Sequence, residues 1–384
     1  MDNPVNQRFY LDYCATTPVH PDVRLAMKAT LDDDFGNPSS MHWAGRRAAE
    51  LIQISRQNTA SGIGCQSDEV HFTSGATESN NLALFGILHQ FAPKNAHLIT
   101  SAVEHHAILH AAEKLAQEGY SVTLLPVDRT GRVDPEQVRK AIRPDTKLVS
   151  IMLVNNEVGA IQPVAEIGRM AHETGVLMHT DAVQGMGLPG WNVDSLNVDL
   201  LSLSGHKIYG PKGIGVLYVR SGIELQPQIY GGPQEGSIRA GTENVPGIAG
   251  MGAAMQLVCE HRQEQQMRLA SLRAQVIDQL AQRIPGMIVN GPEKQVAPHV
   301  LSISFPGADG EMMLLRLNNK GIAVSLGSAC TTKSIEPSHV LSAMGLPIEQ
   351  VEGTLRISMG FPTIQDDLDW LIAVLPEVVK LSRR

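Results

Sequence analysis

Residues 198–213 decide the fold, and they read Val-Asp-Leu-Leu-Ser-Leu-Ser-Gly-His-Lys-Ile-Tyr-Gly-Pro-Lys-Gly. The apolar start, Val198–Leu203, predicts a buried strand that ends in a turn rich in glycine and proline. Lys207 follows this strand, next to a histidine and close to a serine and glycines. An amine at the end of a buried strand is placed to form a Schiff base with an aldehyde. The alternative is a surface lysine whose stem covers apolar groups while its ammonium stays in water.

A carboxylate follows a second apolar run upstream. Val176–His179 leads into Asp181, and the carboxyl ends of neighbouring parallel strands meet at one edge of a sheet. A site for pyridoxal 5′-phosphate (PLP) needs a lysine amine for the cofactor aldehyde and a carboxylate that keeps the ring nitrogen protonated. Asp181 and Lys207 therefore predict a PLP site. The alternative for Asp181 is an ordinary helix cap.

Strand-length apolar runs alternate with helical patterns between about residues 69 and 220. The expected strands are Val70–Thr73, His97–Thr100, Ser121–Leu125, Leu148–Val154, Val176–Thr180, Val198–Leu203 and Gly215–Val219. The expected helices are Thr77–Gln90, Ala107–Gln117 and Val164–Glu173. This alternation predicts an α/β fold with a mainly parallel, seven-stranded sheet covered on both faces.

The chain of 384 residues is long enough for two domains. An Ala-, Met- and Leu-rich pattern over Val245–Ile284 predicts a long helix that connects them. The elements expected beyond it are Val300–Phe305, Gly310–Asn319, Ile322–Ser325, Leu355–Ser358 and a terminal helix from Gln365. We expect a large cofactor-binding domain at 16–260 and a smaller α/β domain made of 1–15 and 261–384.

Composition excludes several classes of function. The chain has 31 basic and 39 acidic residues, a net charge of −8, and no dense basic patch, so no nucleic-acid partner is expected. No stretch approaches the roughly 18 consecutive apolar residues of a membrane span. The polar start Met1-Asp2-Asn3-Pro4 predicts neither a signal nor a transit peptide, so a cytoplasmic location is expected. Cys14, Cys65, Cys259 and Cys330 are far apart, which argues against a disulfide framework or structural zinc.

An anion site is predicted where Thr73-Ser74-Gly75-Ala76-Thr77-Glu78 joins a strand to a helix. A small-residue turn at a helix start presents backbone N–H groups and the positive end of the helix dipole, which suits a phosphate. A plain N-cap with a first-turn glutamate is the alternative. Ser204 and His206 end a strand at the same expected edge and favour the phosphate.

Several polar residues follow other strands of the expected sheet. His105 is placed to lie on a cofactor ring, whereas a metal site at Glu104-His105-His106 lacks a third ligand. Gln184, three residues after Asp181, could reach a ring hydroxyl. The alternative for Gln184, and for the amides in Asn155-Asn156-Glu157, is a satisfied turn residue.

The second domain contributes a thiol and a cation. Cys330 lies in a small-residue loop at about 325–336 that lacks apolar packing partners, which favours a nucleophile over a core residue. Arg356 lies in an otherwise apolar strand. A buried arginine needs an anionic partner, and the carboxylate of a substrate would serve through a bidentate contact.

Taken together, these motifs resemble the cysteine desulfurases of the NifS/IscS type, within the class V aminotransferase group of PLP enzymes. The resemblance runs nearly the whole length of the chain. It rests on Tyr10-Leu11-Asp12, Ala15-Thr16-Thr17-Pro18, Phe35-Gly36-Asn37-Pro38-Ser39, Thr73–Asn80, Glu104-His105, Asn155-Asn156-Glu157, Asp181-Ala182-Val183-Gln184, Ser204–Gly213, Arg239-Ala240-Gly241-Thr242 and Gly327-Ser328-Ala329-Cys330. It implies PLP fold type I and a homodimer whose active sites are completed by the partner subunit.

The resemblance also implies a role for each matching residue. Lys207 resembles the Schiff-base lysine, Asp181 the partner of the ring nitrogen and Cys330 the persulfide-forming cysteine. His105 resembles the residue that stacks on the ring, and Gln184 the contact to the ring oxygen. The implied phosphate ligands are Ala76, Thr77, Ser204, His206 and, given to the neighbouring subunit, Thr242. The implied contacts to the substrate carboxylate are Asn156, Arg356 and Asn37.

The implied reaction converts L-cysteine to L-alanine and leaves the sulfur on Cys330 as a persulfide. An iron–sulfur scaffold or another sulfur acceptor is the expected partner. An aminotransferase or selenocysteine lyase of the same fold is the alternative, and a catalytically silent PLP-fold protein is a third hypothesis. Leu326 stands where the family often has serine, and Tyr13 and Cys14 replace a more usual pair. The departure at Leu326 bears on the acceptor and the efficiency rather than on the type of reaction.

Overall fold

The apolar strands of the first 220 residues assemble into one sheet of seven strands. The computed structural model describes residues 7–326 and 337–383, and the strand order is β2-β8-β7-β6-β5-β3-β4. All neighbours are parallel except at β8, which is antiparallel to β7 and β2. The strands are β2 (Val70–Thr73), β3 (His97–Ser101), β4 (Ser121–Leu125), β5 (Thr146–Ser150), β6 (Leu177–Asp181), β7 (Leu200–Ser204) and β8 (Gly215–Val219). The predicted mainly parallel, seven-stranded sheet is confirmed.

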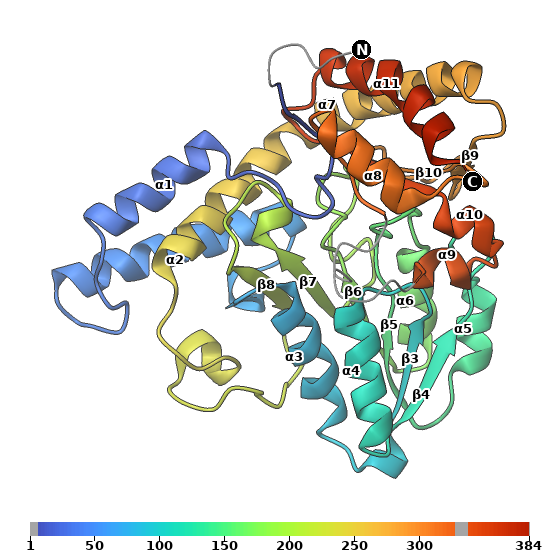
Figure 1. Cartoon of the computed structure of the whole chain (residues 1–384). Helices are drawn as coiled ribbons and strands as arrows, with labels where there is room; N and C mark the ends of the chain where they lie inside the picture. Colours follow the sequence, from blue (N-terminus) through green and yellow to red (C-terminus); the bar gives the residue numbers. More distant parts are fainter. Residues whose placement is uncertain (1–6, 327–336, 384) are drawn as a thin grey trace.

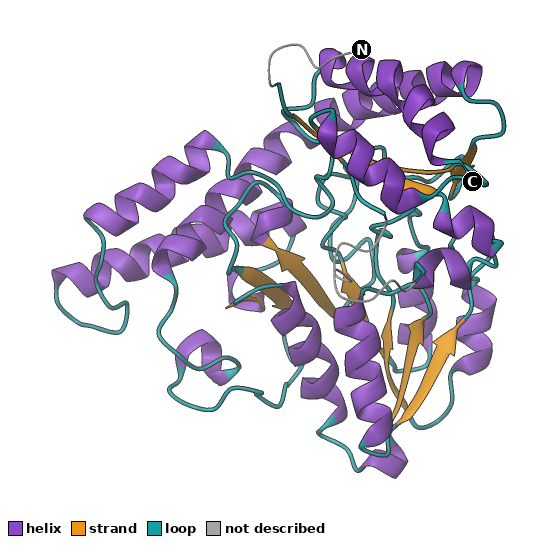
Figure 2. Ribbon diagram, viewed as in Figure 1, coloured by secondary structure: helices purple, strands orange, loops and turns teal. Residues whose placement is uncertain are grey.

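Helices cover both faces of this sheet (Figure 2). They are α3 (Ala76–Leu88), α4 (His106–Gln117), α5 (Pro135–Ala141), α6 (Val164–Glu173) and the first part of α7 (Val245–Arg283). Alternate residues of a strand point to opposite faces. Leu98 and Leu200 therefore share a core with α3 and α4, whereas Ile99 and Leu201 belong to the core that contains α6 and α7.

Two helices near the N-terminus form a hairpin that projects from the sheet. They are α1 (Pro21–Asp32) and α2 (Trp43–Ile63), and both pack along α7 (Figure 1). The apolar pattern of the sequence does not predict these two helices. Each begins after a histidine, because the side chains of His20 and His42 accept hydrogen bonds from the amides of Asp22 and Gly45. Histidine is not among the residues that usually mark an N-cap, so this signal is easily overlooked.

A second core lies beyond the middle of α7. Leu272 and Leu280 of α7 pack with Leu301 of β10 and Leu371 of α11. The elements here are β1 (Phe9–Tyr10), β9 (Ile288–Asn290), β10 (Val300–Ser304), α8 (Gly310–Asn319), β11 (Ile322–Ala323), β12 (Thr354–Ser358) and α11 (Gln365–Ser382). The short helices α9 (His339–Ala343) and α10 (Ile348–Glu352) instead form a separate cluster with Val103, Val158 and Ala160. Because α7 contributes to both cores, the division at residue 260 remains our proposal.

Two strands are clearly shorter than the sequence predicts: β11 covers only Ile322–Ala323 of the expected Ile322–Ser325, and β5 ends early. β5 ends at Ser150, whereas the apolar run continues to Val154. The residues after Ser150 stay buried but leave the regular ladder, and Val154 forms an isolated bridge with Ile161. An apolar run indicates that residues are buried but not that they pair with a neighbouring strand, so it cannot place the end of β5.

In the described part of the chain, no helix has a stretch long and apolar enough to cross a bilayer.

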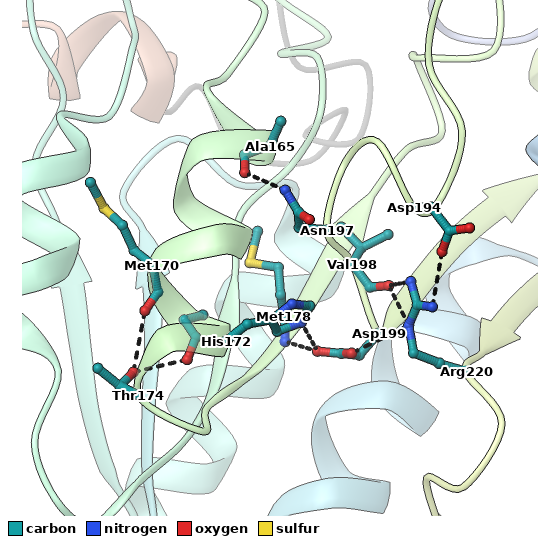
Figure 3. Close-up of polar contacts among 11 residues, drawn as sticks. Ala165, Met170, His172, Thr174, Met178, Asp194, Asn197, Val198, Asp199 and Arg220 are labelled. Carbon is teal, nitrogen blue, oxygen red and sulfur yellow. Dashed lines mark hydrogen bonds and ion pairs between the residues drawn. The ribbon is translucent and has the colours of Figure 1, made fainter.

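Asp199 anchors the amino ends of the strands β6 and β7, on the side of the sheet opposite the candidate site (Figure 3). Its Oδ2 atom lies 2.8 Å from Nε2 of His172 and accepts a hydrogen bond of 2.8 Å from the amide of Met178. Its Oδ1 atom lies 3.5 Å from Nε of Arg220, which also pairs with Asp194 at 2.9 Å. These contacts fix the starts of β6 and β7, so the residues at the other ends of both strands are held in register.

Candidate active site

Two strand ends meet at a single glycine. Thr73 of β2 and Ser204 of β7 are both paired with Gly215, the first residue of β8. A Cβ atom on Gly215 would lie 2.5 Å from the carbonyl carbon of Gly75 and 2.8 Å from Oγ1 of Thr73. Only glycine fits this approach. The turns that follow β2 and β7 therefore lie side by side, as the sequence predicts.

The start of α3 forms an anion cup beside Ser204. Gly75 is the N-cap and has no side chain to accept hydrogen bonds from the first-turn amides of Ala76 and Thr77. Ala76 is half-buried, Thr77 is exposed, and Ser204 is 4% exposed. Uncapped amides and the helix dipole favour an anion at this position. The donor set thus fits a phosphate group.

His206 lies in the turn that directly follows Ser204, and its ring is neutral. Its Nδ1 atom lies 3.1 Å from Oγ1 of Thr16. Burial, together with the charges of Lys207 and Lys212, lowers the pKa of His206 to about 4. At neutral pH the ring can therefore donate a hydrogen bond to a phosphate oxygen without adding a charge.

Lys207 lies where the sequence predicts, directly after β7, in the 3₁₀ turn Gly205–Lys207. Its Nζ atom donates hydrogen bonds to the carbonyl oxygens of Cys14 at 2.5 Å and Ala15 at 2.8 Å. Thr17 holds both sides of the turn, since its amide donates to the carbonyl of His206 and its hydroxyl accepts from the amide of Tyr209. The segment at residues 14–17 therefore wraps the lysine.

Asp181 ends β6 and is 6% exposed. Its Oδ2 atom accepts a hydrogen bond of 2.7 Å from Nδ2 of Asn80, and its Oδ1 atom accepts one of 3.0 Å from the amide of Val183. Both oxygens are thus oriented. Sequence reasoning missed Asn80, although a buried asparagine on the apolar face of α3, near Leu84 and Ala83, is a signal that could have found it.

His105 is both a half-buried ring and the N-cap of α4. Its Nδ1 atom accepts a hydrogen bond of 3.1 Å from the amide of Ala107, so the neutral ring carries its proton on Nε2. Burial lowers the pKa of His105 and keeps it neutral. The preceding residue, Glu104, is fully buried and accepts hydrogen bonds from Ser101 and from the amide of Met152. Burial raises the pKa of Glu104 to about 8.

Gln184 links the segment at Cys14 to His299, which directly precedes β10. Its Nε2 atom donates to the carbonyl of Cys14 at 3.1 Å, and its Oε1 atom lies 3.1 Å from Nε2 of His299. Burial, and secondarily the charge of Arg356, lowers the pKa of His299 to about 4, so this ring is neutral. Gln184, His299 and Lys207 line one pocket. Sequence reasoning missed His299, which no motif singles out.

Arg356 is 1% exposed in β12, and the chain itself supplies an anionic partner. Its Nη2 atom lies 2.9 Å from Oδ1 of Asp12, and its Nη1 atom donates to the carbonyl of Asn156 at 3.2 Å. The sequence argument looked to a substrate for this anion and overlooked Asp12, because the two residues are 344 positions apart. Nε of Arg356 is buried without a hydrogen-bond partner among the described residues.

Two predicted site residues lie on exposed turns rather than with the others. Asn37 is in the turn between α1 and α2, where its Oδ1 atom accepts a hydrogen bond from the amide of Ser39 at 3.0 Å. This turn is at the far end of the projecting hairpin (Figure 1). Thr242 is exposed on the loop at 229–244 that precedes α7.

Cys330 lies outside the described residues, but both ends of its segment are placed. Ser325 exchanges backbone hydrogen bonds with Arg356, at 3.0 and 2.7 Å. Ser338 donates to Oε2 of Glu157, and Nε2 of His339 lies 2.9 Å from the carbonyl of Glu104. Both attachment points thus adjoin site residues. No group of three metal-ligating side chains occurs in residues 7–326 and 337–383.

A lysine, a carboxylate and a neutral imidazole at the carboxyl edge of a mainly parallel sheet, beside an anion cup, define a PLP-dependent enzyme of fold type I. The aminotransferase class-V family model matches residues 9–371. The chain belongs to this family, in its cysteine desulfurase branch, and its cofactor is PLP.

The similarity to proteins of this branch covers nearly the whole chain. The protein named cysteine desulfurase IscS from Dictyoglomus turgidum is 47% identical, over 99% of this chain and 96% of its own length. A solved NifS-like protein has a TM-score of 0.92 and 35% identity, over 98% of this chain and 100% of its own. A structure described as SspA in complex with cysteine has a TM-score of 0.81 and 37% identity, over 91% and 98% of the two chains.

Proposed function

We propose that this protein is a PLP-dependent cysteine desulfurase that converts L-cysteine to L-alanine and carries the sulfur on Cys330. One observation carries the proposal. The segment that holds Cys330 is attached at one end to Arg356 and at the other to Glu157, and these two residues flank Asn156. Both ends of that segment therefore lie next to the groups proposed to bind the substrate carboxylate.

The same edge of the sheet supplies the residues proposed to hold PLP. Ala76, Thr77, Ser204 and His206 would bind its phosphate at the helix start. Asp181 would hold the proton on the ring nitrogen, and the ring of His105 would stack on the cofactor ring. Gln184 would contact the ring oxygen. When bound, PLP accepts the electron pair that the Cα atom of the substrate releases.

Substrate binding and proton transfer follow from the remaining residues. Arg356 is oriented by Asp12 and the carbonyl of Asn156, and its remaining N–H groups, Nε–H among them, would bind the carboxylate of L-cysteine. The amine of Lys207, once free, takes the Cα proton and later returns a proton to carbon. His105 is neutral and carries its proton on Nε2, so it would donate a hydrogen bond from Nε2 to the sulfur of the substrate and hold that sulfur in place.

Sulfur transfer is then a displacement at the sulfur of the substrate. The thiolate of Cys330 forms an S–S bond with this sulfur while the bond from the sulfur to the substrate Cβ atom breaks. The electron pair of the broken bond stays on carbon, which takes up a proton and becomes the methyl group of alanine. The products are alanine and a persulfide on Cys330, so no external oxidant or reductant is needed.

The active protein in this proposal is a homodimer. Thr242 is exposed, as expected of a phosphate ligand that is given to the partner subunit. The hairpin that carries Asn37 also exposes Phe35, Met41 and Trp43, which are 73%, 92% and 69% accessible. Large apolar side chains exposed together mark a protein interface. We propose that this hairpin contacts the second chain and brings Asn37 to the partner's substrate.

The persulfide would pass its sulfur to an acceptor protein such as an iron–sulfur scaffold, in the cytoplasm.

The chemistry can be tested by comparing Cys330→Ala with the matched control Cys259→Ala, because Cys259 is a half-buried thiol on α7. Cys330→Ala should abolish alanine and sulfide production from L-cysteine, whereas Cys259→Ala should leave both unchanged. Full activity of Cys330→Ala would instead favour direct lyase chemistry, as in a selenocysteine lyase.

A further inference from the structure

An ion pair joins the anion cup to the loop that carries Thr242. Nε of Arg239 lies 2.9 Å from Oε1 of Glu78, and the two side chains are 24% and 18% exposed. Glu78 is in the first turn of α3, directly after Ala76 and Thr77. Its other oxygen, Oε2, accepts a hydrogen bond of 2.9 Å from the amide of Ser74. The carboxylate is therefore part of the turn that forms the cup.

A carboxylate at this position opposes the proposed ligand. A first-turn glutamate complements the helix dipole when nothing else is bound, but it repels a phosphate at the same helix start. Burial disfavours ionisation of Glu78, yet the hydrogen bonds from Arg239 and Ser74 outweigh it and lower its pKa. Glu78 is therefore charged at neutral pH, and Arg239 supplies the compensating cation.

The loop that carries Arg239 has a second attachment that does not involve the cup. Nη2 of Arg56 lies 2.8 Å from Oε1 of Glu235, and Oε2 of Glu235 accepts a hydrogen bond of 3.0 Å from the amide of Phe72. Glu235 is 8% exposed, so this contact is buried. Loss of Arg239 leaves the attachment through Glu235 in place, and the electrostatic effect of Arg239 can be measured separately from the folding of the loop.

We propose that Arg239 is a positioning residue for the cofactor phosphate and that it acts through Glu78. Its guanidinium neutralises the carboxylate and holds it against the backbone of Ser74. The uncapped amides of Ala76 and Thr77 can then donate hydrogen bonds to a doubly charged phosphate. The inference rests on the proposed phosphate cup. It differs from a direct contact between Arg239 and the phosphate, in which Glu78 would play no part.

The test is equilibrium binding of PLP and of pyridoxal, which lacks the phosphate, to the full-length apo-protein. Arg239→Gln should weaken PLP binding about tenfold or more, because the unpaired Glu78 then repels the phosphate. Glu78→Gln combined with Arg239→Gln should restore the affinity for PLP to within about threefold of the wild type. Pyridoxal should bind all variants alike. Added salt should reduce the defect of Arg239→Gln, since ions screen the repulsion.

Three results would overturn the inference: PLP affinity of Arg239→Gln equal to that of the wild type, a double variant as weak as Arg239→Gln, or an equal loss of pyridoxal binding. Glu78→Gln alone provides a second test should Arg239→Gln not fold, because it should bind PLP at least as tightly as the wild type. A tenfold loss there contradicts the inference. If the wild type binds pyridoxal as tightly as PLP, the phosphate cup itself is wrong.

Discussion

Nδ2 of Asn80 lies 2.7 Å from Oδ2 of Asp181, so a side chain from the helix that forms the anion cup also orients the proposed partner of the ring nitrogen. The two residues are 101 positions apart in the chain. One helix, α3, thus places groups at both the phosphate and the ring of the cofactor. The positions of the proposed phosphate site and of Asp181 therefore both depend on α3.

Asn80→Ala should weaken PLP binding and lower turnover, because Asp181 loses the hydrogen bond that orients Oδ2. A lost hydrogen bond to a buried carboxylate costs about 1.5–3 kcal/mol, which corresponds to roughly a tenfold to hundredfold change. The matched control is Asn81→Ala, since the side chain of Asn81 donates hydrogen bonds to the carbonyl groups of Thr77 and Ala107 rather than to Asp181. Absorbance titration with PLP measures the effect. Equal affinities of the two variants would contradict the assigned role of Asn80.

Glu104 should make stability depend on pH. Burial raises its pKa from 4.5 to about 8, so the folded chain binds a proton that the unfolded chain releases near pH 4.5. Stability due to this group is therefore present below pH 4.5 and is lost as the pH rises towards 8, by at most about 1.4 kcal/mol per pH unit.

The variant Glu104→Gln removes this dependence. Relative to the wild type, its urea midpoint should rise between pH 5 and pH 8 and then stay level. The control Glu113→Gln changes an exposed carboxyl group and should follow the wild type at every pH. A constant difference between Glu104→Gln and the wild type across this range would show that Glu104 titrates alike in both states.

Ser338 should matter for sulfur transfer more than for cofactor binding. Its hydroxyl donates to Glu157 and caps α9 by accepting from the amide of Leu341 at 3.1 Å. Ser338→Ala removes both contacts next to the segment of Cys330. We expect turnover of L-cysteine to fall about fivefold, the effect of roughly 1 kcal/mol, with unchanged PLP affinity. Ser338→Thr should restore turnover.

The control for this variant is Ser342→Ala, which changes an exposed residue of the same short helix. It should behave as the wild type. If PLP affinity falls in parallel with turnover in Ser338→Ala, the residue supports the fold of the whole site rather than the approach of the thiol.

The strands could be predicted because burial on both faces of a parallel sheet leaves continuous apolar runs in the sequence. β2, β4 and β8 begin and end at the predicted residues. The hairpin of α1 and α2 was missed, since each of these helices begins after a histidine cap and buries few large apolar side chains. The apolar pattern of the sequence therefore identifies the strands of the sheet but not the hairpin of α1 and α2.

The chemistry-bearing residues at strand ends could also be predicted, because Asp181 and Lys207 each follow an apolar run. Their partners could not. Asp12 contacts Arg356, and His299 contacts Gln184, across large distances in sequence. Local periodicity carries no information on such pairs, which arise only when distant segments of the chain pack together. The resemblance to a family identified the roles of single residues and left these contacts unseen.

The most direct test of the central claim is mass spectrometry of the purified holoenzyme after incubation with L-cysteine. The account predicts an added mass of one sulfur atom on the peptide that contains Cys330, removed by a thiol reductant and absent from the peptides of Cys14, Cys65 and Cys259. Release of sulfur and alanine with no such addition at Cys330, or the addition on another cysteine, would contradict it.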